Sequence, residues 1–114
     1  MRADKNLLAG STTLLVLSLL SKGDKYGYEM IAELESRSNR AFTLKEGTLY
    51  PILHALEKEK AVFSYEMEAP TGRVRKYYRI TRRGLSLLEE KQEDWSLFSK
   101  AVNAILAGTD PAPA

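Results

Sequence analysis

The stretch VFSYEMEAPTGRVRKYYRI, residues 62–80, decides the fold that the sequence predicts. Its two ends, Val62 to Glu68 and Val74 to Ile80, are rich in β-branched and aromatic residues, which favour strands. The segment between these ends contains Pro70 and Gly72, which are typical of turns. We therefore expect a β-hairpin, with helical patterns on either side of it in the sequence.

Three helices are predicted before the hairpin. The segment from Lys5 to Leu20 is so dense in leucine that its helix should bury two faces, one of which could pack against a partner chain. The segment from Tyr26 to Ser38 has apolar residues at four-residue steps, which indicates an amphipathic helix. The third helix is expected to begin at Thr43, with Glu46 completing a capping box, and to end at about Glu59.

The third helix is predicted to have two unlike faces. Aliphatic side chains gather on one face, at Leu49, Ile52, Leu53 and Leu56. Small or hydrogen-bonding residues gather on the other, at Gly47, Thr48, Tyr50, Pro51, His54 and Lys58. Pro51 should distort the helix only locally, because its ring meets Gly47 four residues earlier. The aliphatic face should pack on the core, and the other face either contacts the major groove of DNA or simply meets water.

A last, long helix is predicted after the hairpin. Thr81 can cap it, and it should run from about Arg82 to Ala107, roughly 39 Å at 1.5 Å per residue. A stripe with the spacing of a coiled coil and two polar interruptions runs along it, through Leu85, Leu88, Gln92, Trp95, Ser99, Val102 and Leu106. Such a stripe needs a partner helix, so we expect a homodimer.

The predicted fold class is mainly α with a small β-hairpin: a winged helix-turn-helix followed by a long C-terminal dimerisation helix. A chain of 114 residues has room for about one compact core. Residues 1–81 would form the DNA-binding domain, residues 82–108 the dimerisation helix and residues 109–114 a flexible tail. The apolar run from Leu7 to Leu20 is shorter than the ~20 residues of a membrane span, so we expect a cytoplasmic protein with no membrane partner.

Positive charge is concentrated in and after the hairpin. The formal net charge is only +2, yet no acidic residue lies between Pro70 and Leu88. The basic residues of that segment are Arg73, Arg75, Lys76, Arg79, Arg82 and Arg83. Because side chains alternate along a strand, the odd-numbered residues from Arg73 to Arg79 share one face, which suits the hairpin to a nucleic-acid backbone. The alternative is an ordinary solvated edge strand whose charges discourage aggregation.

The sequence argues against an enzyme and against a metal or cofactor site. It has no cysteine, and His54 is its only histidine, which excludes thiolate sites and multi-histidine metal clusters. It contains neither the G-x-G-x-x-G pattern nor the G-x-x-x-x-G-K-[ST] pattern of nucleotide-binding loops. No cofactor is expected, and the lack of cysteine is compatible with a reducing cytoplasm.

Trp95 lies in the middle of the predicted dimer stripe, which leaves two interpretations open. Large aromatic side chains commonly supply interface area, so Trp95 could serve only to pack the dimer. Alternatively, the tryptophans of two chains could stack on a planar apolar ligand. The carboxylates of Glu93 and Asp94 would then favour a cationic ligand.

Several spaced motifs resemble those of PadR-type transcriptional regulators. They are Tyr26-Gly27-Tyr28, Gly47-Thr48-Leu49-Tyr50-Pro51, Leu56-Glu57, Gly72-Arg73 and Lys76-Tyr77-Tyr78-Arg79-Ile80-Thr81 with Gly84. The short last helix with Trp95 is similar to the compact LmrR-like subfamily. The resemblance implies a repressor that dimerises through its first and last helices, with the third helix in the major groove and the wing on the flanking backbone. Lys60-Ala61 departs from the family's usual glycine and larger aliphatic residue, which leaves that turn open.

The resemblance also implies site residues by position. The implied DNA contacts are Tyr26, Tyr28, Lys45, Thr48, Tyr50 and His54, with Arg73, Arg75, Lys76 and Tyr77 from the wing. The implied effector pocket is lined by Leu7, Leu14, Ser18, Trp95, Phe98 and Ser99. The expected partners are double-stranded operator DNA, a second copy of the chain and a planar apolar or cationic small molecule. The rival functions are a winged-helix module that docks an acidic protein and a small-molecule carrier without DNA affinity.

Overall fold

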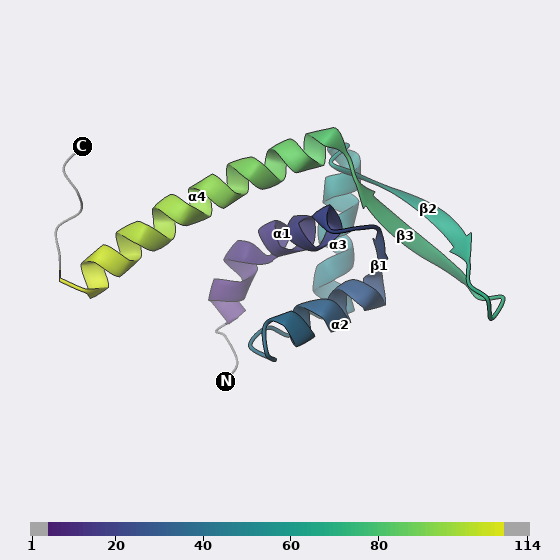
Figure 1. Cartoon of the computed structure of the whole chain (residues 1–114), viewed down its shortest axis with the longest axis horizontal. Coiled ribbons are helices and arrows are strands. Elements are labelled where there is room, and N and C mark those ends of the chain that lie inside the picture. The colour runs from purple at the N-terminus through teal and green to yellow at the C-terminus, as the bar shows by residue number, and fades with distance from the viewer. Residues whose placement is uncertain (1–4, 109–114) are drawn as a thin grey trace.

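The computed structural model describes the backbone of residues 5–108 and the side chains of residues 8–108. Its elements follow in the order α1 (Lys5–Ser21), β1 (Lys25–Tyr26), α2 (Gly27–Arg37), α3 (Glu46–Lys58), β2 (Val62–Glu68), β3 (Val74–Ile80) and α4 (Arg82–Leu106). The first three helices pack together, the hairpin projects on one side, and α4 runs out on the other (Figure 1). The mainly helical fold with a small hairpin is confirmed. The predicted tail at residues 109–114 lies outside the described residues, and the domain boundary at residue 81 stays a prediction.

The sheet is antiparallel, with the strand order β1-β3-β2. Both strands of the hairpin have the predicted bounds. The sequence did not predict β1, in which Lys25 pairs with Tyr78 and Tyr26 pairs with Tyr77. This pairing holds Tyr26 in extended backbone, and α2 therefore begins at Gly27, one residue later than expected.

The core is centred on α1, whose density of apolar residues predicted burial on more than one face. Val16 and Leu17 are fully buried. The other buried members of the core are Leu19, Leu20, Met30, Leu34, Leu44, Leu49, Leu53, Leu56, Ala61, Val62, Tyr78 and Leu88. Burial of each large apolar side chain contributes roughly 1.5–3 kcal/mol to the stability of the fold. The hydrophobic effect in this cluster is therefore the main interaction that holds the helices and the sheet together. No helix within the described residues is long and apolar enough to span a membrane.

The start of α3 differs from the prediction. The capping box expected at Thr43 is wrong, because the helix begins at Glu46, with Lys45 as its N-cap and no side-chain cap bond. Leu44 is buried in the core, and Lys45 next to it has extended backbone. Because Leu44 is fixed in the core and Lys45 is extended, helical backbone begins only at Glu46. Pro51 lies within the helix and does not interrupt it.

The end of α3 is a Schellman turn, at the point where the resemblance left the turn open. The N–H of Lys60 donates to the carbonyl oxygen of Glu57, and the N–H of Ala61 donates to the carbonyl oxygen of Leu56. Lys60 has a φ of 67°, in the left-handed region that favours glycine. Ala61 is fully buried, and β2 begins at the next residue, Val62. The turn therefore connects α3 directly to β2.

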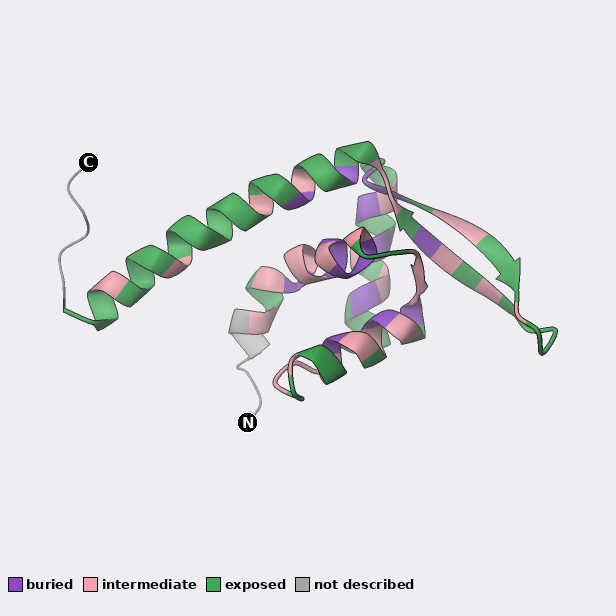
Figure 2. Ribbon diagram, in the orientation of Figure 1, coloured by how far each residue is buried: buried purple, intermediate pink, exposed green. Residues whose placement is uncertain are grey.

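The first two turns of α4 are anchored on the core by Gly84 and Leu88, and the rest of the helix is largely uncovered. Thr81 caps the helix as predicted, since its hydroxyl oxygen accepts a hydrogen bond from the N–H of Gly84 at 3.1 Å. Leu88 is buried in the core of its own protomer. Beyond Leu88 most of the helix is exposed (Figure 2), including Trp95 and Leu106. The predicted stripe is thus divided between the protomer's core and an accessible surface.

Gly84 should tolerate no side chain. It is buried, and a Cβ there would overlap the carbonyl oxygen of Ala61 and the side chain of Ile80. We predict that Gly84→Ala lowers the free energy of unfolding by roughly 1–3 kcal/mol, despite the helix preference of alanine, because the overlap involves backbone. Gly47→Ala is the control, since Gly47 is also helical but has open space around it. Urea unfolding followed by circular dichroism compares the two variants, and equal midpoints would contradict this close packing of α4.

Candidate nucleic-acid interface

The outer face of α3 is accessible, as a recognition helix requires. Lys45, Thr48 and His54 are exposed, whereas Leu49 and Leu53 on the opposite face are buried. Ammonium, hydroxyl and imidazole groups can bond phosphate oxygens or base edges. The structure therefore leaves each of these three predicted contacts accessible to a ligand.

Tyr50 is less accessible than the sequence implied. It is half-buried and packs against the core, with its hydroxyl against the first turn of α2. This approach depends on Gly27, where a Cβ would overlap the hydroxyl oxygen of Tyr50. The ring thus joins α2 to α3, and only part of its surface remains open to a ligand.

A cleft of about 480 Å³ lies between the wing and the first turns of α2 and α3. Its lining residues are Tyr26, Gly27, Tyr28, Glu46, Tyr50, Arg73, Val74, Arg75 and Lys76. The cleft therefore brings together most of the contacts predicted on α2 and on the wing. Its three cations face a single carboxylate, that of Glu46, so the cleft attracts anions.

The outward face of the sheet carries a row of aromatic rings. Tyr78 is buried, so the odd-numbered residues of β3 lie on the face away from the core. On that face Tyr77 stacks on Tyr65 and meets Tyr26 edge-on, with ring centres 5.8 and 5.4 Å apart. The guanidinium of Arg75 lies 4.4 Å from the centre of the Tyr26 ring. Tyr77 is half-buried between the rings of Tyr65 and Tyr26. The guanidinium of Arg75 packs on the ring of Tyr26.

Arg79 is paired within the protein. Its Nε and Nη2 atoms donate to the carboxylate of Asp24 over 2.7–3.1 Å, and the hydroxyl of Tyr65 donates to the same group. The hydrogen bond from Arg79 is the main cause that holds the pKa of Asp24 below its ordinary value. The pKa of Tyr65 is raised, because its hydroxyl donates to that carboxylate. The basic run of the sequence therefore includes one cation that already has an internal partner.

A second cavity, of about 570 Å³, lies between α1 and α4. Its lining residues are Gly10, Ser11, Thr13, Leu14, Lys91, Asp94, Trp95 and Phe98. Leu14, Trp95 and Phe98 of the predicted effector pocket meet there.

Two other residues of the predicted effector pocket, Ser18 and Ser99, do not line this cavity. Ser18 lines a separate hollow with Leu34 and Phe42, because it lies on the side of α1 that faces α2. The hydroxyl of Ser99 donates to the carbonyl oxygen of Ser96. The side chain of Leu7 lies outside the described residues. The predicted pocket is thus only partly assembled within one protomer.

The arrangement of helices and wing matches that of a known family. The model of the transcriptional regulator PadR-like family matches residues 16–90. The chain belongs to this family. A transcriptional regulator from Clostridium thermocellum has a similar structure, with a TM-score of 0.80 and 35% identity over 87% of this chain and 96% of that one. For a PadR-like transcriptional regulator from Bacillus cereus, the TM-score is 0.78 and the identity 33%, over 90% and 97% of the two chains.

A curated relative agrees with this assignment. The transcriptional regulator YqjI of Escherichia coli is 28% identical over 99 residues, which are 87% of this chain and 46% of YqjI. The protein is therefore a PadR-like, DNA-binding transcriptional regulator and not an enzyme. Among the residues that the structure describes, no three histidine, cysteine, aspartate or glutamate side chains gather into a metal site.

Asp24 is the residue of this interface that sequence reasoning missed. It lies next to Gly23 in the short segment between α1 and β1. Its partner Arg79 lies 55 residues later in the chain. No local pattern connects the two residues, and the pair becomes visible only when β1 is placed beside β3.

Proposed function

We propose that this PadR-like regulator is a repressor that binds an inverted-repeat operator as a homodimer. The main support is the cleft between the wing and the first turns of α2 and α3, because it gathers three cations beside the start of α3. An operator half-site would set its major groove against Thr48 and His54, and its flanking phosphates against Arg73 and Lys76. Such a repressor must reach chromosomal DNA, so we also propose that the protein is cytoplasmic. Membership of the LmrR-like subfamily stays a prediction.

The second half of α4 supports the homodimer. Its large apolar side chains are open to water in the protomer, with exposed fractions of 51% for Trp95, 60% for Phe98, 77% for Ile105 and 78% for Leu106. Contiguous apolar surface of this kind marks an interaction site. A second chain that covers it would also bring two copies of α3 into one particle, as binding to the two half-sites of an inverted repeat requires.

Ile105→Lys should weaken the dimer. Burial of such a side chain contributes roughly 1.5–3 kcal/mol, so we expect the dissociation constant of the dimer to rise about tenfold or more. The matched control is Asn103→Lys, which adds the same charge at an exposed polar position of the same helix. Analytical ultracentrifugation measures both constants. A monomeric wild type, or equal constants for the two variants, would count against the homodimer.

Binding to the DNA upstream of its own gene tests the repressor directly. In fluorescence polarisation, we expect higher affinity for this promoter duplex than for an unrelated duplex of equal length, and a decrease with salt. Arg73→Ala should reduce the slope of log affinity against log salt by about 0.9 for each phosphate that the variant no longer neutralises. Lys100→Ala is the matched control, since it removes an exposed cation from α4, away from the cleft.

Two outcomes of the same titration would contradict the proposal. Equal affinity for both duplexes would exclude sequence-specific regulation through this promoter. Absence of DNA binding even at low salt would favour the rival function, in which the basic wing docks an acidic protein.

The cavity between α1 and α4 favours a small-molecule effector as a further part of the proposal. The rings of Trp95 and Phe98 lie 6.2 Å apart between centres, and Asp94 lines the same cavity. The two rings suit a planar aromatic molecule, and Asp94 can pair with a positive charge on that molecule, although Lys91 lines the same cavity. Such a ligand releases operator DNA only if it binds the DNA-free dimer more tightly than the bound one.

Ethidium is a planar aromatic cation that can probe this cavity without DNA present. It should quench the fluorescence of Trp95, the only tryptophan of the chain. Asp94→Asn should weaken this binding about threefold, as expected when a partly exposed ion pair is removed. Glu93→Gln is the control, because Glu93 does not line the cavity. Quenching that responds equally to both substitutions would show that the cation does not sit beside Asp94.

A further inference from the structure

Asp24 links all three strands of the sheet through one carboxylate. It directly precedes β1, and it accepts hydrogen bonds from Arg79 of β3 and Tyr65 of β2. Arg79 approaches with both Nε and Nη2, a two-point contact that fixes orientation as well as distance. The side chain of Asp24 is only 23% exposed, so water screens the pair incompletely.

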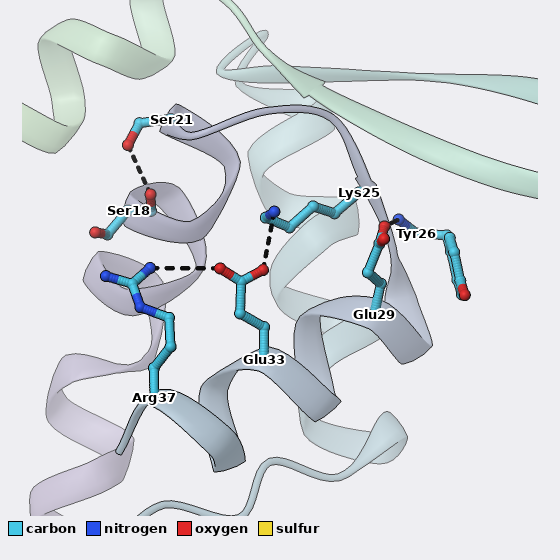
Figure 3. A network of polar contacts seen from close by, with 7 residues as sticks. All are labelled: Ser18, Ser21, Lys25, Tyr26, Glu29, Glu33 and Arg37. Carbon is cyan, nitrogen blue, oxygen red and sulfur yellow. Dashed lines mark hydrogen bonds and ion pairs between the residues drawn. The ribbon is translucent and has the colours of Figure 1, made fainter. Parts of the chain in front are cut away.

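The segment that follows Asp24 is fastened at its other end to α2. β1 consists of only two residues, so its pairing with β3 gives it little stability of its own. The N–H of Tyr26 donates to the carboxylate of Glu29, and Lys25 forms an ion pair with Glu33 at 2.8 Å (Figure 3). Asp24 therefore connects the wing to a segment that is itself tied to α2.

We propose that Asp24 is a positioning residue for DNA recognition. Its contacts with Arg79 and Tyr65 fix the angle between the wing and α2. That angle sets how far the cations of the wing, such as Arg73, lie from Tyr28 on the opposite wall of the cleft. The inference rests on the proposed function, because it assigns Asp24 a role in the selective binding of operator DNA.

The alternative is that Arg79 contacts a phosphate, and that Asp24 merely neutralises it when no DNA is bound. The surroundings of Arg79 favour the positioning role. Its guanidinium lies 5.7 Å from the ring centre of Phe63 and 5.5 Å from that of Tyr65, in addition to its two-point contact with Asp24. A phosphate would have to break the ion pair and displace these ring contacts.

The two roles predict opposite effects when Asp24 is made neutral. If Asp24 only neutralises Arg79, the freed cation raises the affinity for any DNA. If Asp24 positions the wing, affinity for the promoter duplex falls relative to an unrelated duplex. The informative quantity is therefore the ratio of the two affinities, not either affinity alone.

Asp24→Asn and Glu66→Gln form a matched pair for this measurement. Each removes one negative charge from the region of the sheet, but Glu66 is exposed and lies on the other face of β2 from Tyr65. We expect Asp24→Asn to reduce the promoter-to-unrelated affinity ratio about tenfold, within the range of coupled contacts. Glu66→Gln should leave the ratio unchanged. An unchanged ratio in Asp24→Asn, or a higher promoter affinity, would overturn the proposal.

Arg79→Gln completes a double-mutant cycle. If the pair acts as one unit, the variant that carries both Asp24→Asn and Arg79→Gln should be no less selective than either single variant. Additive reductions in selectivity would mean that the two side chains act separately, and would overturn the positioning role.

A measurement without DNA separates this inference from the proposed function. Amide hydrogen exchange in β1 should be faster in Asp24→Asn than in Glu66→Gln, with the exchange of α1 unchanged in both. Unchanged exchange in β1, with promoter preference retained by the wild type, would overturn the positioning role alone. Absence of promoter preference in the wild type would overturn the proposed function, and the role of Asp24 in DNA recognition with it, even if β1 exchanges faster.

Discussion

The burial of Tyr78 determines how the wing is presented to a partner. β3 is the central strand of the sheet, and the side chain of Tyr78 is 1% exposed. Because side chains alternate along a strand, this anchor commits Arg75, Tyr77 and Arg79 to the opposite face. A shift of one residue in register would bury arginines in the core, where an unpaired charge cannot be solvated. The register of the wing is therefore fixed by the core, not by the turn at its tip.

Beside this anchor, a side-chain hydrogen bond ties the wing to α3. The hydroxyl of Tyr78 has no hydrogen-bond partner among the described residues, and burial, with the nearby charge of Glu57, raises its pKa. An unsatisfied hydroxyl costs about 1–3 kcal/mol, which the burial of the ring can offset. Glu57 of α3 in turn accepts a hydrogen bond from Ser64 of β2 at 2.7 Å. The wing and α3 are thus held together before any DNA is bound.

Local sequence patterns predicted the fold better than they predicted the site. The bounds of the hairpin and the cap at Thr81 depend on residues close together in the chain, and both were predictable. The start of α3 was not, because the burial of Leu44 overrides the capping signal at Thr43. At the site, the sequence identified residue types but not their partners. The partial burial of Tyr50, for example, depends on the missing side chain of Gly27 in another helix.

Three basic residues of β3 have internal partners, and β3 is the central strand of the sheet, not the solvated edge strand that the sequence left as an alternative. Arg79 is neutralised by Asp24, while Arg75 lies over Tyr26, and Lys76 lies 5.6 Å from the ring centre of Tyr78. A cation over an aromatic ring keeps its charge but has less conformational freedom before binding. The entropy cost is then smaller when it meets a phosphate, so each contact contributes more to affinity. Pre-organised cations around one cleft can therefore bind DNA strongly even though the net charge of the chain is only +2.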